Sequence, residues 1–255
     1  MRRPSPPRTR ARVPPARAAL LTPTRRRDAR SGGCCLLALR PPGLSVERRW
    51  RAHDLETWAI HLGRRRQRGA GAAAIYTGAD DCALKAWDAR GDLGRPVFVN
   101  RREHAAGVTC IAGSPHDANV LVTGSYDEHV RVWDVRNPAV PVLRAAAPSA
   151  DKVHCGGGVW RVKFHPADGA LLLVACMHGG FRIMRVDAAG AADGEPAPAR
   201  TLRHYERHAS LAYGADWVQV RGGRGTGAGK GAGAATVVST CSFYDRSLHV
   251  WEARL

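Results

Sequence analysis

The residue pair Trp-Asp recurs along this chain, and its spacing constrains the fold more than any other feature. Trp87 and Trp133, each followed by Asp, are 46 residues apart. Met184 stands at the corresponding place 51 residues further on, and Trp251 follows after another 67. Repeats of about 40–50 residues that end in Trp-Asp are typical of four-stranded β-propeller blades. The chain is therefore predicted to be all-β.

Apolar segments inside each repeat predict the strands of one blade. The second repeat contains VTCIAGSP, NVLVTGS and HVRVWDV, and the third contains GVWRVKFHP, LLLVACM and GFRIMRV. Such short runs rich in Val, Leu and Ile, bounded by turn residues, favour strands. Four units of this kind are recognisable in residues 47–255. Because four is few for a closed ring, we expect a partial WD-repeat β-propeller of about four blades.

The last repeat is longer than the others because it contains the Gly-rich segment 221–235, RGGRGTGAGKGAGAA. Glycine and small residues in such a run are typical of a flexible loop. A phosphate-binding loop is excluded, since Gly231 stands where the motif requires Ser or Thr after Lys230.

Most of the positive charge lies at the N-terminal end. The net charge of the chain is +17, of which residues 1–70 carry +14. Residues 1–46 are rich in Arg and Pro, which oppose compaction, and we expect this basic segment to be disordered. Three interpretations stay open for it: a transit peptide, a nucleic-acid-binding arm, and an artefact of the gene start. Nucleic acid is expected as a partner only through this segment.

The remaining composition favours a cytoplasmic protein without cofactors. Seven cysteines follow no disulfide spacing, which is typical of a reducing compartment. No apolar run approaches the length of a transmembrane helix, so no membrane partner is expected. No complete set of tetrahedral ligands is visible, so no metal site is expected either.

A histidine precedes each repeat, and an acidic residue follows the second strand in three of the four. In WD repeats such residues hydrogen-bond each other and stiffen the blade. The expected structural pairs are His53–Asp81, His104–Asp127 and His208–Asp245. In the third repeat His154 would instead face His178, so two imidazoles are expected where a His–Asp pair belongs.

Several strings are more specific than the Trp-Asp repeat itself. They are GGGVWRVKFHP, ACMHGGF, YGADW and CSFYDRSLHVWE, in this order. Together they resemble the WD-repeat diphthine methylesterase family of the diphthamide pathway, over about residues 48–255 apart from the Gly-rich loop. Members of that family have a longer N-terminal half that supplies further blades.

The resemblance implies a carboxylic ester hydrolase. Its substrate would be the methyl ester of diphthine, the modified histidine of translation elongation factor 2, which carries a trimethylammonium group beside the ester. Elongation factor 2 would therefore be the partner. The alternative is a non-catalytic WD-repeat scaffold for protein–protein interaction, because fold alone does not imply function.

Ester hydrolysis needs a nucleophile or a water molecule, together with a base. No G-x-S-x-G motif is present. Our hypothesis makes His178 the general base, with His154 facing it, because imidazole exchanges protons near neutral pH. Water, Cys155 or Ser242 would attack the ester. The opposing interpretation is that both histidines only bond each other or loop carbonyls.

Aromatic side chains are the natural partners of a quaternary ammonium group, which has no N–H to donate. The candidates for substrate binding are Tyr126, Trp160, Tyr213 and Tyr244. Ordinary packing within the blades is the alternative interpretation for each of them.

Overall fold

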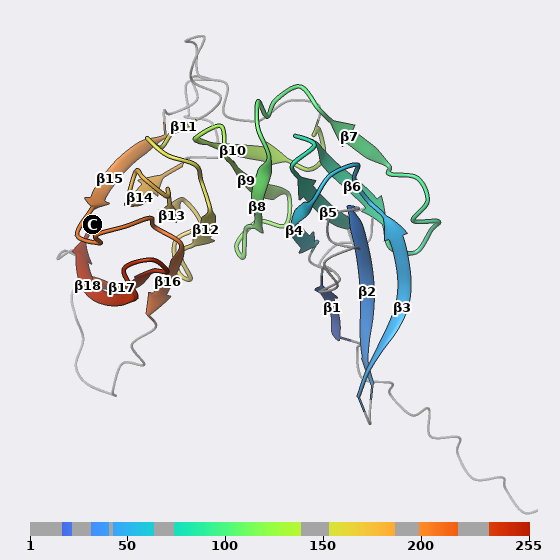
Figure 1. The fold of residues 1–255 in the computed structure, drawn as a ribbon, viewed down its shortest axis with the longest axis horizontal. Helices are drawn as coiled ribbons and strands as arrows, with labels where there is room; N and C mark the ends of the chain where they lie inside the picture. Colours follow the sequence, from blue (N-terminus) through green and yellow to red (C-terminus); the bar gives the residue numbers. More distant parts are fainter. Residues whose placement is uncertain are drawn as a thin grey trace, which may run out of the picture.

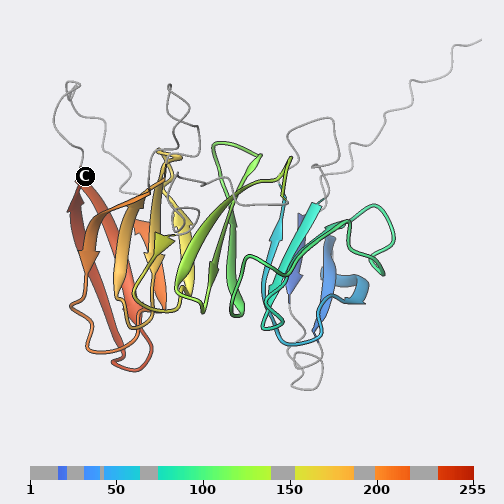
Figure 2. The ribbon, with the colours of Figure 1, turned by 90° about the horizontal axis from the view of Figure 1, so that it is seen from above.

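The computed structural model describes residues 17–21, 32–40, 43–63, 74–138, 153–186, 199–218 and 235–255. Within these residues all regular structure is β, in five antiparallel sheets. Figure 1 shows the sheets following one another around an open arc. Seen from above in Figure 2, they stand side by side like blades. The predicted all-β propeller architecture is confirmed.

The strands of each sheet follow one another in the sequence. The first two sheets contain β1 (Arg17–Leu21), β2 (Gly33–Arg40) and β3 (Gly43–Arg51), then β4 (Thr57–Leu62), β5 (Ala74–Ala79), β6 (Leu84–Asp88) and β7 (Phe98–Asn100). The third contains β8 (Val108–Gly113), β9 (Val120–Ser125), β10 (His129–Asp134) and β11 (Val153–His154). The last two contain β12 (Arg161–Phe164), β13 (Leu171–Ala175), β14 (Phe181–Arg185) and β15 (Arg200–Tyr205), then β16 (Gly214–Val218), β17 (Ala235–Ser242) and β18 (Ser247–Arg254).

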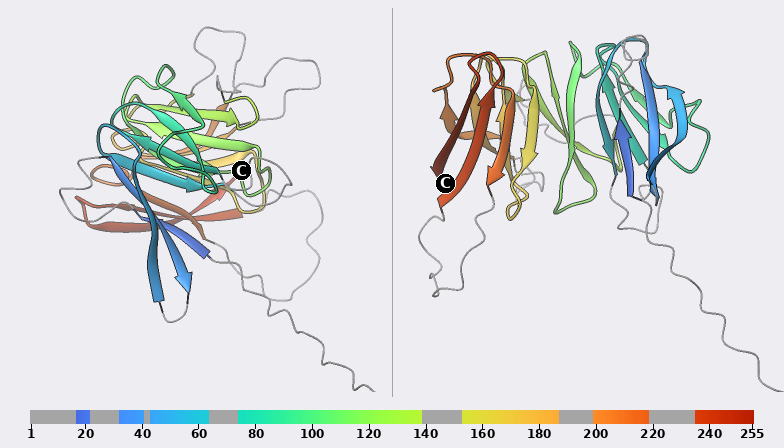
Figure 3. Two further views of the ribbon diagram at one scale, coloured as in Figure 1. Left: turned by 90° about the vertical axis from the view of Figure 1, so that its right-hand side faces the viewer. Right: turned by 60° about the horizontal axis from the view of Figure 1, so that its bottom comes forward.

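The four repeats recognised in the sequence correspond to the last four sheets. Their first strands, β4, β8, β12 and β16, lie toward the inner side of the arc, and β7, β11 and β15 lie toward its outer side (Figure 1). The two further views of Figure 3 show the β1–β3 sheet at one end of the arc and the β16–β18 sheet at the other. Starts of inner strands from different repeats therefore meet on one face.

The structure differs from the expected disorder in part of residues 1–46. Residues 33–40 and 43–46 belong to the paired strands β2 and β3. Cys34, Leu36 and Ala38 are buried, and the first two pack with Ile75 and Trp87 of the next sheet. The physical reason is the uncharged apolar run at residues 34–39, whose burial offsets the cost of ordering the chain. Apart from residue 32 and the strand at 17–21, the rest of that segment lies outside the described residues, as do residues 221–234.

The hydrophobic core lies between consecutive sheets. In β13 every residue is buried, and successive side chains point to opposite faces. Leu172 and Val174 pack toward the third sheet, whereas Leu171 and Leu173 pack toward the last one. This two-sided burial explains why the strand reads as a continuous apolar run. Among the described residues there is no helical segment with the length and hydropathy that a bilayer crossing requires.

A buried chain of hydrogen bonds braces the second sheet. His53 Nδ1 lies 2.9 Å from the Asp81 carboxylate, and its Nε2 lies 2.8 Å from the Thr77 hydroxyl. The Trp87 indole donates to the same hydroxyl at 2.9 Å. Burial lowers the pKa of His53 below its usual value, so the neutral ring donates from Nδ1 and accepts at Nε2. The structure thus brings His53 and Asp81 together.

The last sheet repeats this arrangement. His208 Nδ1 lies 3.3 Å from Asp245, Nε2 lies 3.0 Å from Thr240, and Trp251 donates to Thr240 at 3.3 Å. Ser247 is an additional partner of His208 Nδ1, at 2.8 Å. His208 and Asp245 are therefore also brought together.

The third sheet departs from the expected pairing. His104 bonds Thr123 through Nε2 at 3.0 Å, but its buried Nδ1 has no hydrogen-bond partner among the described residues. Asp127 instead accepts hydrogen bonds from both terminal nitrogens of buried Arg131, at 3.0 and 2.7 Å. A guanidinium offers the carboxylate two charge-assisted bonds, which outcompete one bond from a neutral imidazole. The predicted direct His104–Asp127 hydrogen bond is wrong for this reason.

Candidate functional site

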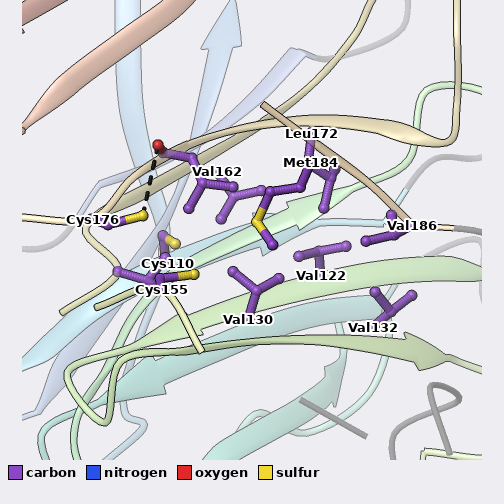
Figure 4. Packing of buried hydrophobic residues seen from close by; sticks show 12 residues of the cluster. Cys110, Val122, Val130, Val132, Cys155, Val162, Leu172, Cys176, Met184 and Val186 are labelled. Atoms are coloured by element: carbon purple, nitrogen blue, oxygen red, sulfur yellow. Dashed lines mark hydrogen bonds between the residues drawn. The ribbon is translucent and has the colours of Figure 1, made fainter. Parts of the chain in front are cut away.

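In the β12–β15 sheet the whole histidine–threonine–tryptophan chain is absent. Met184 lies opposite Leu172 just as Trp133 lies opposite Leu121, so the strand registers of the two sheets correspond. On this register Cys155, Val174 and Met184 take the places of histidine, threonine and tryptophan. All three are fully buried in one apolar cluster, in which Figure 4 labels Cys155 and Met184. The repeat has therefore exchanged its polar brace for apolar packing.

The expected contact between His154 and His178 is not formed. His154 belongs to β11 and pairs with His129 of β10. Its side chain is exposed, and its Nε2 lies 2.8 Å from the Glu128 carboxylate. The residue that leads the third repeat is the neighbouring Cys155, one position later. The position predicted from the sequence spacing was wrong by one residue, because His154 is the last residue of β11.

His178 lies in the turn between β13 and β14, and its side chain is exposed. The turn is held against the segment 155–157 by backbone contact. A Cβ atom on Gly157 would lie 2.2 Å from the Cys176 carbonyl oxygen, and one on Gly179 would lie 2.3 Å from the Cys155 carbonyl oxygen. Because only glycine permits this approach, the Gly-Gly pairs of both segments fix the position of His178.

A pocket of about 520 Å³ opens beside His178. It lies between the β12–β15 sheet and the last sheet and is lined by Met177, His178, Gly180, Tyr205, Glu206, His208, Ala209, Ser210, Leu211 and Tyr244. His178 is therefore exposed among the residues that line a concave site, and it does not lie in the blade interior.

The two proposed protein nucleophiles are not open to this pocket. Cys155 is fully buried and lies in the apolar cluster with Cys110 and Cys176 (Figure 4). The hydrogen bond with Cys155, together with burial, raises the pKa of the Cys176 thiol above its ordinary value. Ser242 is 3% exposed, and its hydroxyl has no hydrogen-bond partner among the described residues.

A continuous set of aromatic rings, here called the aromatic row, crosses the same face. Its members are Trp58, Tyr126, Trp160, Tyr213, Tyr244 and Phe243. The ring centroids of Trp58 and Trp160 are 5.8 Å apart, those of Trp160 and Tyr213 are 5.2 Å apart, and those of Tyr213 and Tyr244 are 5.9 Å apart. The structure brings the four predicted substrate-binding aromatics into this row, and Tyr244 also lines the His178 pocket.

Trp58 was missed by the sequence reasoning. It is the second residue of β4, the inner strand of its sheet, and is 41% exposed. Thr57-Trp58 corresponds to Val159-Trp160 two repeats later, at twice the 51-residue spacing. This correspondence between repeats could have identified Trp58 from the sequence.

Two glycines let the Tyr126 ring lie between the sheets. A Cβ atom on Gly107 would lie 3.2 Å from Cδ2 of the ring, and one on Gly158 would lie 3.2 Å from Cδ1. Burial, and after it the negative charges of Asp80 and Glu56, raise the pKa of the Tyr126 hydroxyl. This end of the aromatic row therefore lies near two negatively charged side chains.

No group of three or more His, Cys, Asp or Glu side chains within the described residues could hold a metal ion.

Comparisons with known proteins connect this fold to two kinds of relative. Residues 94–134 match the family model "WD domain, G-beta repeat". A chain of the solved "Crystal Structure of Mitotic Checkpoint Complex" superposes with a TM-score of 0.62 at 18% identity, covering 88% of this chain and 57% of that one. This likeness shows the fold alone.

Curated proteins named for diphthine are similar over longer segments. Diphthine methyltransferase of Mus musculus is 44% identical over 168 residues, which is 66% of this chain and 31% of the mouse protein. The Homo sapiens protein of that name is 39% identical over 69% of this chain and 35% of its own length. Diphthine methyltransferase homolog of Dictyostelium discoideum is 32% identical over 82% of this chain and 53% of its own. The chain thus spans about a third to a half of these relatives.

Proposed function

We propose that this chain takes part in hydrolysing the methyl ester of diphthine on translation elongation factor 2, a step in diphthamide biosynthesis. The names of its relatives in mouse, human and Dictyostelium support diphthine as the substrate. The observation that carries the proposal is the open pocket shared by His178 and Tyr244, because it joins a base to the end of an aromatic row.

In this mechanism water is the nucleophile. His178 accepts a proton as the water oxygen attacks the ester carbonyl, and a tetrahedral intermediate forms. The intermediate collapses by breaking the bond to the methoxy oxygen, which takes the proton back from the imidazolium. One ester and one water thus give one carboxylic acid and one methanol. Water is preferred to Cys155 and Ser242 because both side chains are buried.

The trimethylammonium group of diphthine lies close to its ester, so it must bind close to His178. Tyr244 meets this requirement, since it lines the pocket with His178 and contacts Tyr213. An aromatic face attracts a quaternary ammonium ion through the ring quadrupole. We assign this end of the row to the cation of diphthine. His154 has no part in this mechanism, because it lies at the edge of another sheet.

The compartment proposed for this reaction is the cytoplasm. None of the seven cysteines forms a disulfide, which agrees with a reducing environment.

The test is methanol release from elongation factor 2 bearing methylated diphthine, without any added methyl donor. His178→Ala should lower the rate by at least about 100-fold, which is the usual contribution of a general base. The matched control is His116→Ala, which removes another exposed imidazole, one that hydrogen-bonds the His165 carbonyl. Unchanged turnover by a folded His178→Ala protein would remove His178 from the mechanism. A requirement for a methyl donor would instead indicate methyl transfer.

A second candidate function is non-catalytic docking. The last sheet exposes Phe243, Leu248 and Val250 at 73%, 68% and 63%, and exposed apolar side chains of this kind support protein contacts. Binding of elongation factor 2 irrespective of the methyl ester, with no methanol released, would favour this function over hydrolysis.

A further inference from the structure

The end of the aromatic row distant from the His178 pocket is a triangle of rings from three sheets. It consists of Trp58, Tyr126 and Trp160, here called the aromatic platform. The centroid of Trp58 lies 6.5 Å from that of Tyr126 and 5.8 Å from that of Trp160, and Tyr126 and Trp160 are 6.1 Å apart. Trp58 leaves 41% of its surface exposed. The platform is therefore accessible to a ligand from solvent through Trp58.

Two carboxylates border the platform. Asp80 packs against Gly107, where a Cβ atom would lie 2.4 Å from its Oδ1 and 3.2 Å from the Tyr126 ring. The Asp80 amide donates to the Glu56 carbonyl at 3.0 Å, which holds the two residues side by side. Both are half-buried. Negative charge is thus placed beside the rings, where it strengthens their attraction for a cation.

These carboxylates differ from their neighbours, because no cationic partner contacts them among the residues that the structure describes. Asp54 and Asp81 each pair with Arg101, and Asp127 pairs with Arg131. Within the described part of the chain, no Lys, Arg or His forms an ion pair with Glu56 or Asp80. Half-buried carboxylates gain from a partner that replaces their lost hydration. The charge at this position is complementary to a cation from another molecule.

We propose that the aromatic platform, with Glu56 and Asp80, binds an arginine side chain of the protein partner. A guanidinium group can stack its plane on an aromatic ring while its edge donates to carboxylates. The site is a recognition subsite separate from the pocket that takes the ester. It deepens the proposed function, on which it rests for the identity of the partner, because it gives a protein substrate a second point of attachment.

The direct test uses the full chain and two small probes, Nα-acetyl-arginine methylamide and its neutral citrulline counterpart. Binding is followed by NMR through the indole N–H resonances. The arginine probe should shift the Trp58 resonance, and the citrulline probe, of nearly the same shape without charge, should bind at least about tenfold more weakly. Equal affinity for the two probes would overturn the proposal.

Variants separate the roles of rings and charges. Trp58→Ala and the double change Glu56→Gln with Asp80→Asn should each weaken binding of the arginine probe by about tenfold or more, with the Trp160 resonance as reporter for Trp58→Ala. Phe243→Ala removes an exposed ring at the far end of the aromatic row and is the matched control. Full affinity in Trp58→Ala would contradict the subsite. Circular dichroism confirms that each variant is folded.

Binding of the arginine probe does not depend on catalysis by His178. His178→Ala should bind the arginine probe as the unchanged chain does. Probe binding without methanol release would uphold the platform and refute the proposed hydrolysis, whereas methanol release without probe binding would do the reverse.

Discussion

At the scale of single residues, three buried threonines connect histidine to tryptophan. Thr77, Thr123 and Thr240 each accept the indole N–H of a tryptophan and bond a histidine Nε2. One hydroxyl thereby satisfies two buried polar groups, and its loss leaves both without a partner.

Replacement of Thr77 by valine should therefore destabilise the fold. Thr77→Val keeps the shape of the side chain but removes the partner of His53 Nε2 and Trp87 Nε1, at an expected cost of about 1–3 kcal/mol for each unsatisfied group. Urea denaturation measures the change. Thr201→Val, at an exposed position of β15, is the control and should stay within about 0.5 kcal/mol. Equal stability of the two variants would show that the threonine bonds contribute nothing.

Histidine and aspartate could be found from the sequence because their spacing recurs, and two of the three predicted pairs are in contact. The threonines were not predicted, since a threonine in an apolar strand is not distinctive. Arg131 was also missed. Its charge is typical of an exposed residue, but in β10 it lies on the same face as the buried Trp133. Its side chain is 1% exposed and bonds Asp127.

At the scale of elements, the β13–β14 turn and the segment leading into β12 touch through their backbones. Gly157 and Gly179 each face a carbonyl oxygen of the other segment, closer than any side chain would allow. The pattern HGG was recognised as unusual in the sequence, but its structural partner, GGG at 156–158, lies about 20 residues away. Only the packing of the two segments reveals the connection.

Addition of a methyl group at this contact should disrupt it. Gly157→Ala would place Cβ 2.2 Å from the Cys176 carbonyl oxygen, and backbone cannot move aside as a flexible side chain can. We expect a loss of about 2–4 kcal/mol in the free energy of unfolding. Gly43→Ala is the matched control, because nothing lies within 4 Å of its Cβ position. Thermal unfolding of both proteins checks the prediction, which fails if their midpoints agree.

Most strands of the second and third repeats were predicted from the sequence. Apolar runs and turn residues identified the strands of the second and third repeats because both signals are local. Strand β11 was not expected, and its inclusion of His154 removed that histidine from the site. The β2–β3 pair was not predicted, because the average composition of this Arg-rich region suggested disorder although it contains a short apolar run.

At the scale of the whole molecule, the histidines that brace different sheets share one electrostatic property. Burial lowers the pKa of His53 and His208, and it lowers that of His104 to about 3. Their ordinary value is 6.5. All three rings are therefore neutral in the folded protein at neutral pH.

The stability of the fold should consequently fall as the solution is acidified. The unfolded chain takes up protons on these histidines below about pH 6.5, where the folded chain still excludes them, so each contributes a loss of up to about 1.4 kcal/mol per pH unit. The stabilising contribution is complete above that pH. Lowered pKa values of Asp81 and Asp245, about 2 in each case, act only below about pH 4.

Urea denaturation at pH 7.5, 6.5 and 5.5 measures this slope. Thr201→Val changes no titratable group and should leave the slope unchanged, which makes it the control. A stability that is constant or rises from pH 7.5 to 5.5 would contradict the argument.

The sequence by itself determined the period, the strands and the residue types that mark each repeat, because all of these are local and repeat along the chain. The tertiary structure alone decided which side chains meet. Trp58, Tyr126, Trp160, Tyr213 and Tyr244 come from four sheets, and they form one row because the sheets pack side by side around the arc. It also decided that His178 opens to a pocket while Cys155 is buried, since exposure depends on neighbours distant in sequence.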